Sequence, residues 1–182
     1  MTLARPKNTS RYSWSRHRIS ITLLSWSGCR ASEIASLTLK QINQAILDQA
    51  FTIVKPKTGN TRHIILPEQA VDALKALKLD FAVVFEGNKE KPLASGLVST
   101  ELLSSVQWLA SLNYFIRLAQ VKFNLVLTSH SFRAHYIICL LRAVPLQGAT
   151  KLIAHSSTNT TAHYDRYFVN ATLVRSTLGE LL

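Results

Sequence analysis

Apolar residues recur at helical spacing along most of the chain, and this pattern predicts a mainly helical domain. The first predicted helix covers residues 12–27 and ends at Gly28, because glycine accepts the left-handed backbone that closes many helices. A short helix over residues 31–37 follows it. Further helices are expected over residues 67–77, 99–120, 129–143, 145–154, 158–166 and 172–182.

One stretch breaks the helical pattern. Phe51 and Ile53 precede the turn sequence Pro-Lys-Thr-Gly-Asn at 56–60, and the apolar run 63–66 follows it, which predicts two strands around a turn. A further strand is expected over 41–45, and the run 81–85 is predicted to be a strand or a core turn. The sum is an α+β fold, mainly α-helical, with a small antiparallel β-sheet near its N-terminal side.

Composition fits a globular domain with a core of its own. The 182 residues are 47% apolar and 17% charged, and no apolar run approaches the roughly 18 residues that a membrane span needs. We therefore expect no membrane partner. Cys29 and Cys139 lie far apart, outside any metal-ligand spacing, so we expect two reduced core thiols and no metal site.

The charge is strongly positive, with 21 Lys and Arg against 10 Asp and Glu, which favours a polyanionic partner such as nucleic acid. No acidic residue precedes Glu33. Residues 1–11 are predicted to be a basic N-terminal arm, although their composition also suits a transit peptide. Without a secretory signal, the expected location is cytoplasm or nucleoid, or a plastid or mitochondrion for an organelle-encoded protein.

Six polar side chains, spread over four segments of the chain, are of the types that phosphodiester transfer without a metal requires. This chemistry needs guanidinium groups to clamp the phosphate oxygens, a nucleophile in line with the leaving group, and a general acid. Singly, each residue also fits a surface cation or a packed histidine, while the scattered acids disfavour a metal nuclease. The candidate catalytic residues are Arg30, Lys57, His130, Arg133, His155 and Tyr164.

In order and spacing these groups resemble the conserved boxes of the tyrosine recombinase, or phage integrase, family. The resemblance covers residues 12–168 and implies a catalytic domain over 12–182, without the core-binding domain that usually precedes it. It implies that Arg30, in Gly-Cys-Arg-Ala-Ser-Glu, and Arg133 clamp the scissile phosphate. Glu33 would support Arg30, and Lys57, in Lys-Thr-Gly, would protonate the leaving 5′-oxygen.

The resemblance assigns the remaining site residues as well. His130, three residues before Arg133, would act as acid/base and phosphate ligand, and His155 would donate a hydrogen bond to a non-bridging oxygen. Tyr164, nine residues after His155, would form a 3′-phosphotyrosine, with Tyr167 as the competing nucleophile. No metal and no cofactor would be needed, because the phosphotyrosine bond conserves the energy for rejoining.

The implied function is site-specific DNA recombination on double-stranded DNA, by a homotetramer or together with a partner recombinase. Lys55 and Arg62, which flank the predicted hairpin turn, are the expected DNA contacts. Ala154 and Ala134 depart from the family pattern, which has glycine and a basic residue there. Two alternatives stay open: topoisomerase IB-like nicking and rejoining, and a DNA-binding relic that has lost catalysis.

Overall fold

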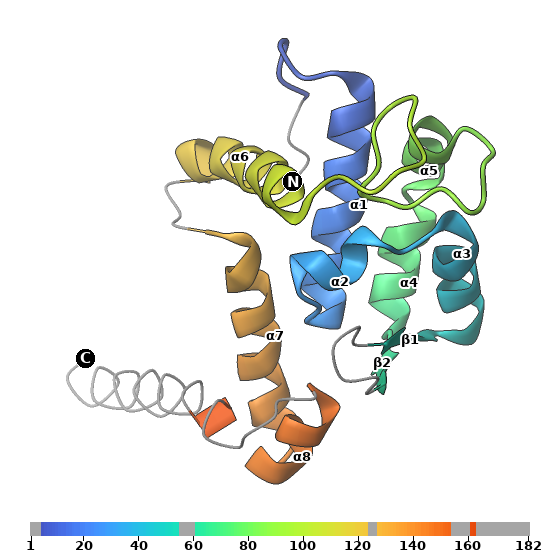
Figure 1. Cartoon of the computed structure of the whole chain (residues 1–182). Coiled ribbons are helices and arrows are strands. Elements are labelled where there is room, and N and C mark those ends of the chain that lie inside the picture. The colour runs from blue at the N-terminus through green and yellow to red at the C-terminus, as the bar shows by residue number, and fades with distance from the viewer. Residues whose placement is uncertain (1–4, 55–60, 124–126, 154–160, 163–182) are drawn as a thin grey trace. The chain divides into compact units, whose positions relative to one another are not determined.

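The computed structural model describes residues 5–54, 61–123, 127–153 and 161–162, with backbone alone over 119–123 (Figure 1). The chain divides into two compact units, Met1–Arg133 and Ala134–Leu182. None of the described helices combines the length and the apolar run that crossing a bilayer requires. The mainly helical α+β fold with a small antiparallel sheet is confirmed.

The first unit is built around its N-terminal helix. α1 packs against α5, α4 and α2, and α3 packs against β1 (Figure 1). Ser10 caps α1 by accepting a hydrogen bond from the Ser13 backbone N–H at 3.1 Å, and Gly28 ends it with φ 59°. The elements of this unit are α1 (Arg11–Ser27), α2 (Ala31–Ala35), α3 (Leu39–Asp48), β1 (Ala50–Val54), β2 (Thr61–Ile65), α4 (Glu68–Lys75), α5 (Lys78–Phe85), α6 (Ser105–Phe123) and the first turn of α7 (Ser129–Ala143).

The predicted hairpin is present. β1 and β2 pair antiparallel, with Thr52 opposite His63 and Ile53 opposite Arg62. Side chains alternate between the two faces, so Ile53, Arg62 and Ile64 are buried while Thr52 and His63 are exposed. The turn at 55–60 lies outside the described residues.

Two predicted strands are helices instead. Residues 41–45 belong to α3, where Thr38 and Gln41 form a capping box and Ile42 and Ala45 face the core three residues apart. Residues 81–85 belong to α5, whose Phe81, Val84 and Phe85 are buried at helical spacing. In both places the apolar run is too short for its period to separate strand from helix.

The long helix α6 begins later than its sequence suggests. Ser104, rather than Ser99 or Thr100, accepts from the Gln107 backbone N–H at 3.3 Å and so caps the helix. The preceding segment is held by an isolated bridge between Ser95 and Leu102. Trp108 is buried in the core, and its Nε1 donates to the Ala31 carbonyl at 2.8 Å, which ties α6 to the start of α2.

The second unit begins inside α7 and continues into α8 (Leu146–Leu152), which starts after Pro145 as predicted. Ala149 and Ile153 are buried, and Thr150 donates to the Leu146 carbonyl at 2.8 Å. The expectation of two core thiols is right for Cys29, which is buried, and wrong for Cys139, which is exposed.

A buried polar cluster joins α1 to α6 in the first unit. Arg16 donates to the Ser95 carbonyl at 2.8 Å and to Ser111 Oγ at 3.1 Å. His17 Nε2 lies 2.9 Å from the same Ser111 Oγ, while its Nδ1 is buried and has no hydrogen-bond partner within the described residues. We assign the proton to Nε2, because the other tautomer would bury an N–H at Nδ1 without an acceptor.

Burial, and then the neighbouring charge of Arg16, lower the pKa of His17 from its ordinary 6.5 to about 3. Below pH 6.5 the unfolded chain therefore takes up a proton that the folded protein refuses. We expect this histidine to remove about 2 kcal/mol of stability between about pH 7.5 and about pH 5. Urea unfolding across this pH range should show a shallower pH dependence for His17→Gln than for the wild type. Parallel curves would contradict the assignment.

Candidate active site

The corner between α1 and α2 positions the first arginine of the candidate site. Gly28 adopts the left-handed conformation, and Arg30 then takes extended angles (φ −75°, ψ 152°) as the N-cap of α2. The Arg30 side chain stays 46% exposed. A cation at a helix N-terminus meets an unfavourable helix dipole, so Arg30 needs a compensating negative charge nearby.

Glu33, one turn further along α2, supplies that charge. Its Oε2 accepts from the Arg30 backbone N–H at 2.7 Å, and its Oε1 accepts from Arg30 Nη1 at 2.9 Å. Oε2 also accepts from Arg62 Nη2 at 3.0 Å. The carboxylate is thus shared between two guanidinium groups and a backbone N–H.

Opposing influences act on the Glu33 carboxyl group. Burial raises its pKa, but the Arg30 backbone N–H, the Arg62 charge and the Arg30 side chain together outweigh burial and hold the pKa below its ordinary value. Glu33 is therefore ionised at neutral pH. The structure shows this carboxylate bonded to the backbone and the side chain of Arg30, and its supporting role stays a prediction.

Arg62 does not occupy the place expected for a DNA contact. Its side chain is 3% exposed, and its Nη2 donates to Glu33 and to Cys29 Sγ, the latter at 3.1 Å. Arg62 bonds Glu33 and Cys29 through its guanidinium and is not among the described residues that line the pocket beside Arg30, so an internal ion pair takes the place of the expected DNA contact. The alternation of β2 contains the signal, because Arg62 shares the buried face with Ile64, two residues on.

Arg133 comes to the same corner from the first turns of α7. Its side chain is only 1% exposed, and its Nη1 donates to the Gly28 carbonyl. Burial, followed by the charges of Arg30 and Arg62, lowers the pKa of Arg133 to about 10, so the group is still charged at neutral pH. Among the residues that the structure describes, arginines 30, 62 and 133 thus lie near the one carboxylate of Glu33, so positive charge is in excess there.

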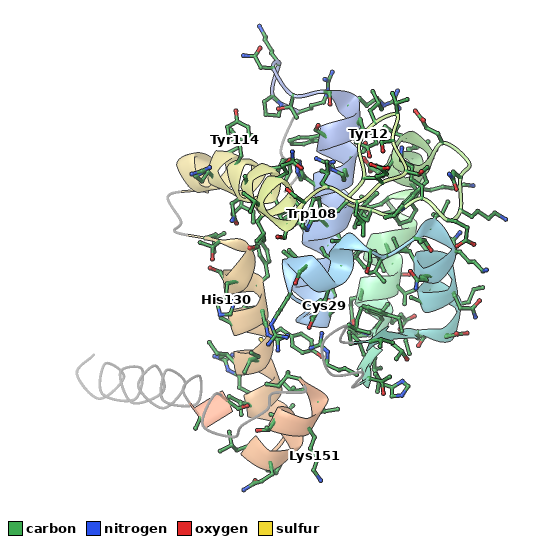
Figure 2. The ribbon with its side chains drawn as sticks, in the orientation of Figure 1. Tyr12, Cys29, Trp108, Tyr114, His130 and Lys151 are labelled. Atoms are coloured by element: carbon green, nitrogen blue, oxygen red, sulfur yellow. The ribbon has the colours of Figure 1, made fainter. Side chains whose placement is uncertain are left out.

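A pocket of about 210 Å³ opens beside this cluster. His130, an exposed residue in the first turn of α7 (Figure 2), lines it together with Ser129. The Ser129 backbone N–H donates to Asn113 Oδ1 at 3.1 Å. It is lined by Arg30, Ala31, Ser32, Leu109, Ser129, His130 and Arg133. Three of the predicted catalytic residues, from two distant segments of the chain, therefore meet around one cavity with cationic walls.

The other predicted site residues, Lys57, His155 and Tyr164, lie outside the described residues, as does Lys55. Their roles stay predictions from the sequence.

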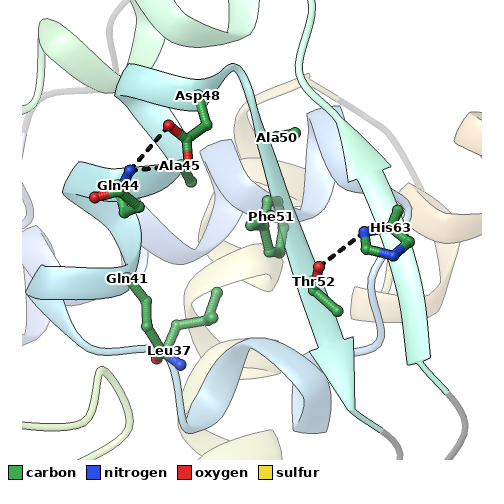
Figure 3. Close-up of a pocket in the computed structure, with 9 residues that line it drawn as sticks. All are labelled: Leu37, Gln41, Gln44, Ala45, Asp48, Ala50, Phe51, Thr52 and His63. Carbon is green, nitrogen blue, oxygen red and sulfur yellow. Dashed lines mark hydrogen bonds between the residues drawn. The ribbon is translucent and has the colours of Figure 1, made fainter.

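A second pocket, of about 360 Å³, lies between α3 and the hairpin (Figure 3). Four of its polar side chains are paired with one another: Thr52 Oγ1 lies 2.9 Å from His63 Nδ1, and Gln44 Nε2 donates to Asp48 at 2.9 Å. The described residues that line it include no arginine and no lysine. The arginine-lined pocket, although smaller, is therefore the better candidate for an anionic substrate.

The two ion pairs of Glu33 should differ in their effect on stability. Glu33→Ala leaves the buried Arg62 without its carboxylate and should lower the free energy of unfolding by about 3 kcal/mol. Arg30→Ala removes the exposed partner and should cost less than about 1 kcal/mol. Urea denaturation monitored by circular dichroism measures both variants. Equal losses would show that burial of Arg62 does not depend on Glu33.

The fold of this chain is similar to that of several solved recombinases and integrases. The crystal structure of XerA recombinase matches with a TM-score of 0.61 and 16% identity, over 90% of this chain and 61% of that one. XerH recombinase bound to palindromic difH substrate, in a post-cleavage complex, gives 0.65 and 16% over 95% and 48%. A lambda integrase (75–356) dimer bound to a COC′ core site gives 0.54 and 18% over 90% and 60%.

These similarities establish the fold. The chain spans between 47% and 65% of the length of the solved structures that it matches. No match was found among curated protein sequences. The model of the phage integrase family, however, matches residues 5–170, which is most of the sequence and includes every candidate catalytic residue. The chain therefore belongs to the phage integrase family.

Proposed function

We propose that this chain is the catalytic part of a site-specific recombinase that cuts and rejoins double-stranded DNA through Tyr164. One observation carries the proposal: Arg30, His130 and Arg133, far apart in the sequence, line one pocket with an excess of positive charge. Membership of the phage integrase family supports the same conclusion.

The pocket suits a phosphodiester in its transition state. Negative charge gathers on the two non-bridging oxygens as the nucleophile attacks, and guanidinium groups stabilise that charge at any working pH. Arg133 is anchored by the Gly28 carbonyl and Arg30 by Glu33, so both cations are held in place before the substrate arrives. Such preorganisation lowers the barrier, because little reorganisation is left to the reaction itself.

In each step of the proposed reaction, one phosphoester bond breaks as another forms. The phenolic oxygen of Tyr164 attacks the scissile phosphorus, the bond from phosphorus to the 5′-oxygen breaks, and a 3′-phosphotyrosine forms. Lys57 donates a proton to the leaving 5′-oxygen, while His130 takes up the tyrosine proton and His155 hydrogen-bonds a non-bridging oxygen. Attack by a 5′-hydroxyl then releases the tyrosine and restores the DNA backbone.

Recombination joins two duplexes, so we propose that the protein works as a homotetramer on DNA or with a partner recombinase. The solved relatives described above include an integrase dimer and a XerH complex on their DNA sites, which supports a DNA-bound assembly. The charge of +11 favours association with a phosphate backbone and predicts binding that weakens as salt rises.

Incubation with supercoiled plasmid in EDTA at low salt tests the proposed chemistry. We expect the wild type and Tyr167→Phe to form an SDS-stable protein–DNA adduct, and Tyr164→Phe to form none. Arg30→Ala should slow adduct formation by about 100-fold or more, because it removes a transition-state clamp.

Three outcomes would contradict the proposal in different ways. An adduct from Tyr164→Phe would move the nucleophile elsewhere. Measurable DNA binding without any adduct would indicate a DNA-binding relic. Relaxation of the plasmid that never exchanges strands between two sites would indicate a topoisomerase-like activity.

A further inference from the structure

Arg62 is a buried cation that the proposed chemistry does not use directly. It stands on β2, opposite Ile53 and one residue from the start of the strand, with its guanidinium inside the first unit. Its Nη2 is bonded to Glu33 and Cys29, while its Nε is buried and has no hydrogen-bond partner in the part of the chain described. Burying a guanidinium is costly, and a packed apolar side chain often gives equal or greater stability.

The contact that distinguishes Arg62 is the one to Glu33. Glu33 Oε1 bonds the Arg30 guanidinium, and Oε2 is shared by the Arg30 backbone N–H and Arg62 Nη2. Arg62 therefore restrains the carboxylate through the oxygen that does not bond the Arg30 guanidinium. Rotation of that carboxylate would move the acceptor that orients Arg30.

Arg30 depends on this restraint more than Arg133 does. Arg133 is buried and bonded to the backbone carbonyl of Gly28, whereas the Arg30 side chain is 46% exposed. An exposed arginine loses side-chain entropy when it is held in one geometry, so its orientation requires a fixed partner. Glu33, 10% exposed and paired with a buried cation, is such a partner.

We propose that Arg62 is a positioning residue that acts through Glu33 to hold the Arg30 guanidinium in the geometry needed for phosphate transfer. This inference rests on the proposed function and adds to it a residue of the hairpin. In the sequence, β2 begins four residues after Lys57, the predicted general acid.

Single-turnover cleavage by the full chain tests the proposal, with Arg62→Met, Arg62→Lys and Glu33→Gln. We expect Arg62→Met to lower the cleavage rate constant by about 10-fold, within the range of coupling for residues in one hydrogen-bonded network. Its DNA dissociation constant should stay within about 2-fold, because positioning acts in the transition state. Arg62→Lys, which keeps a cation, should recover part of the rate.

A double variant separates action through Glu33 from a general structural effect. If Arg62 works through this carboxylate, Glu33→Gln combined with Arg62→Met should cleave no more slowly than Glu33→Gln alone. Arg16→Met is the matched control, since it also removes a buried guanidinium, one that bonds Ser95 and Ser111 instead. At a temperature where all variants are folded, it should cleave at the wild-type rate.

A readout that needs no cleavage keeps this inference distinct from the proposed function. In nitrogen-15 spectra of arginine side chains, the Arg30 signal, identified by its loss in Arg30→Lys, should shift or broaden in Arg62→Met and persist in Arg16→Met. An unchanged Arg30 signal, or additive rate losses in the double variant, would overturn the inference. A wild type without an adduct would defeat the proposed function, while the spectra would still decide the role of Arg62.

Discussion

The sharing of one carboxylate between two arginines is the interaction on which the candidate site depends. Glu33 accepts hydrogen bonds from the Arg30 backbone N–H, the Arg30 guanidinium and the Arg62 guanidinium. The donors of these three hydrogen bonds come from two elements, the start of α2 and strand β2. The carboxylate therefore links β2 to the helix start that carries Arg30. An exposed cation at a helix N-terminus would otherwise be held weakly, because both the helix dipole and side-chain entropy oppose it.

Charge imbalance is the second constraint, and it follows from the first. Within the described residues three guanidinium groups, those of Arg30, Arg62 and Arg133, stand against the one carboxylate of Glu33. Burial, together with the charges of Arg30 and Arg62, lowers the pKa of Arg133. A phosphate in the adjoining pocket would offset this surplus, so the energy stored as repulsion in the free protein favours binding of an anion. In the pocket beside α3, Gln44 pairs with Asp48 and Thr52 with His63, so no comparable excess of positive charge attracts an anion there.

Local signals made much of the fold predictable from the sequence. Gly28 and Pro145 mark helix boundaries, and the turn sequence at 56–60 marks the hairpin. The runs 41–45 and 81–85 were wrongly predicted because their helical character depends on a capping box and on packing against α1. The role of Arg62 was mispredicted for a different reason. The alternation of β2 places its side chain on the buried face, but the carboxylate that it bonds comes from α2. Only tertiary packing brings the two residues together.

The candidate site lies at helix ends, and this location explains how its side chains are held in place. Arg30 is the N-cap of α2, Arg133 bonds the carbonyl of the glycine that ends α1, and His130 lies in the first turn of α7. Backbone groups at helix ends have no partner within their own helix, so they can bind side chains at no cost to the helix. The geometry of the proposed phosphate clamp is therefore set by helix boundaries, and a change that shifts the α1–α2 corner would displace both arginines together.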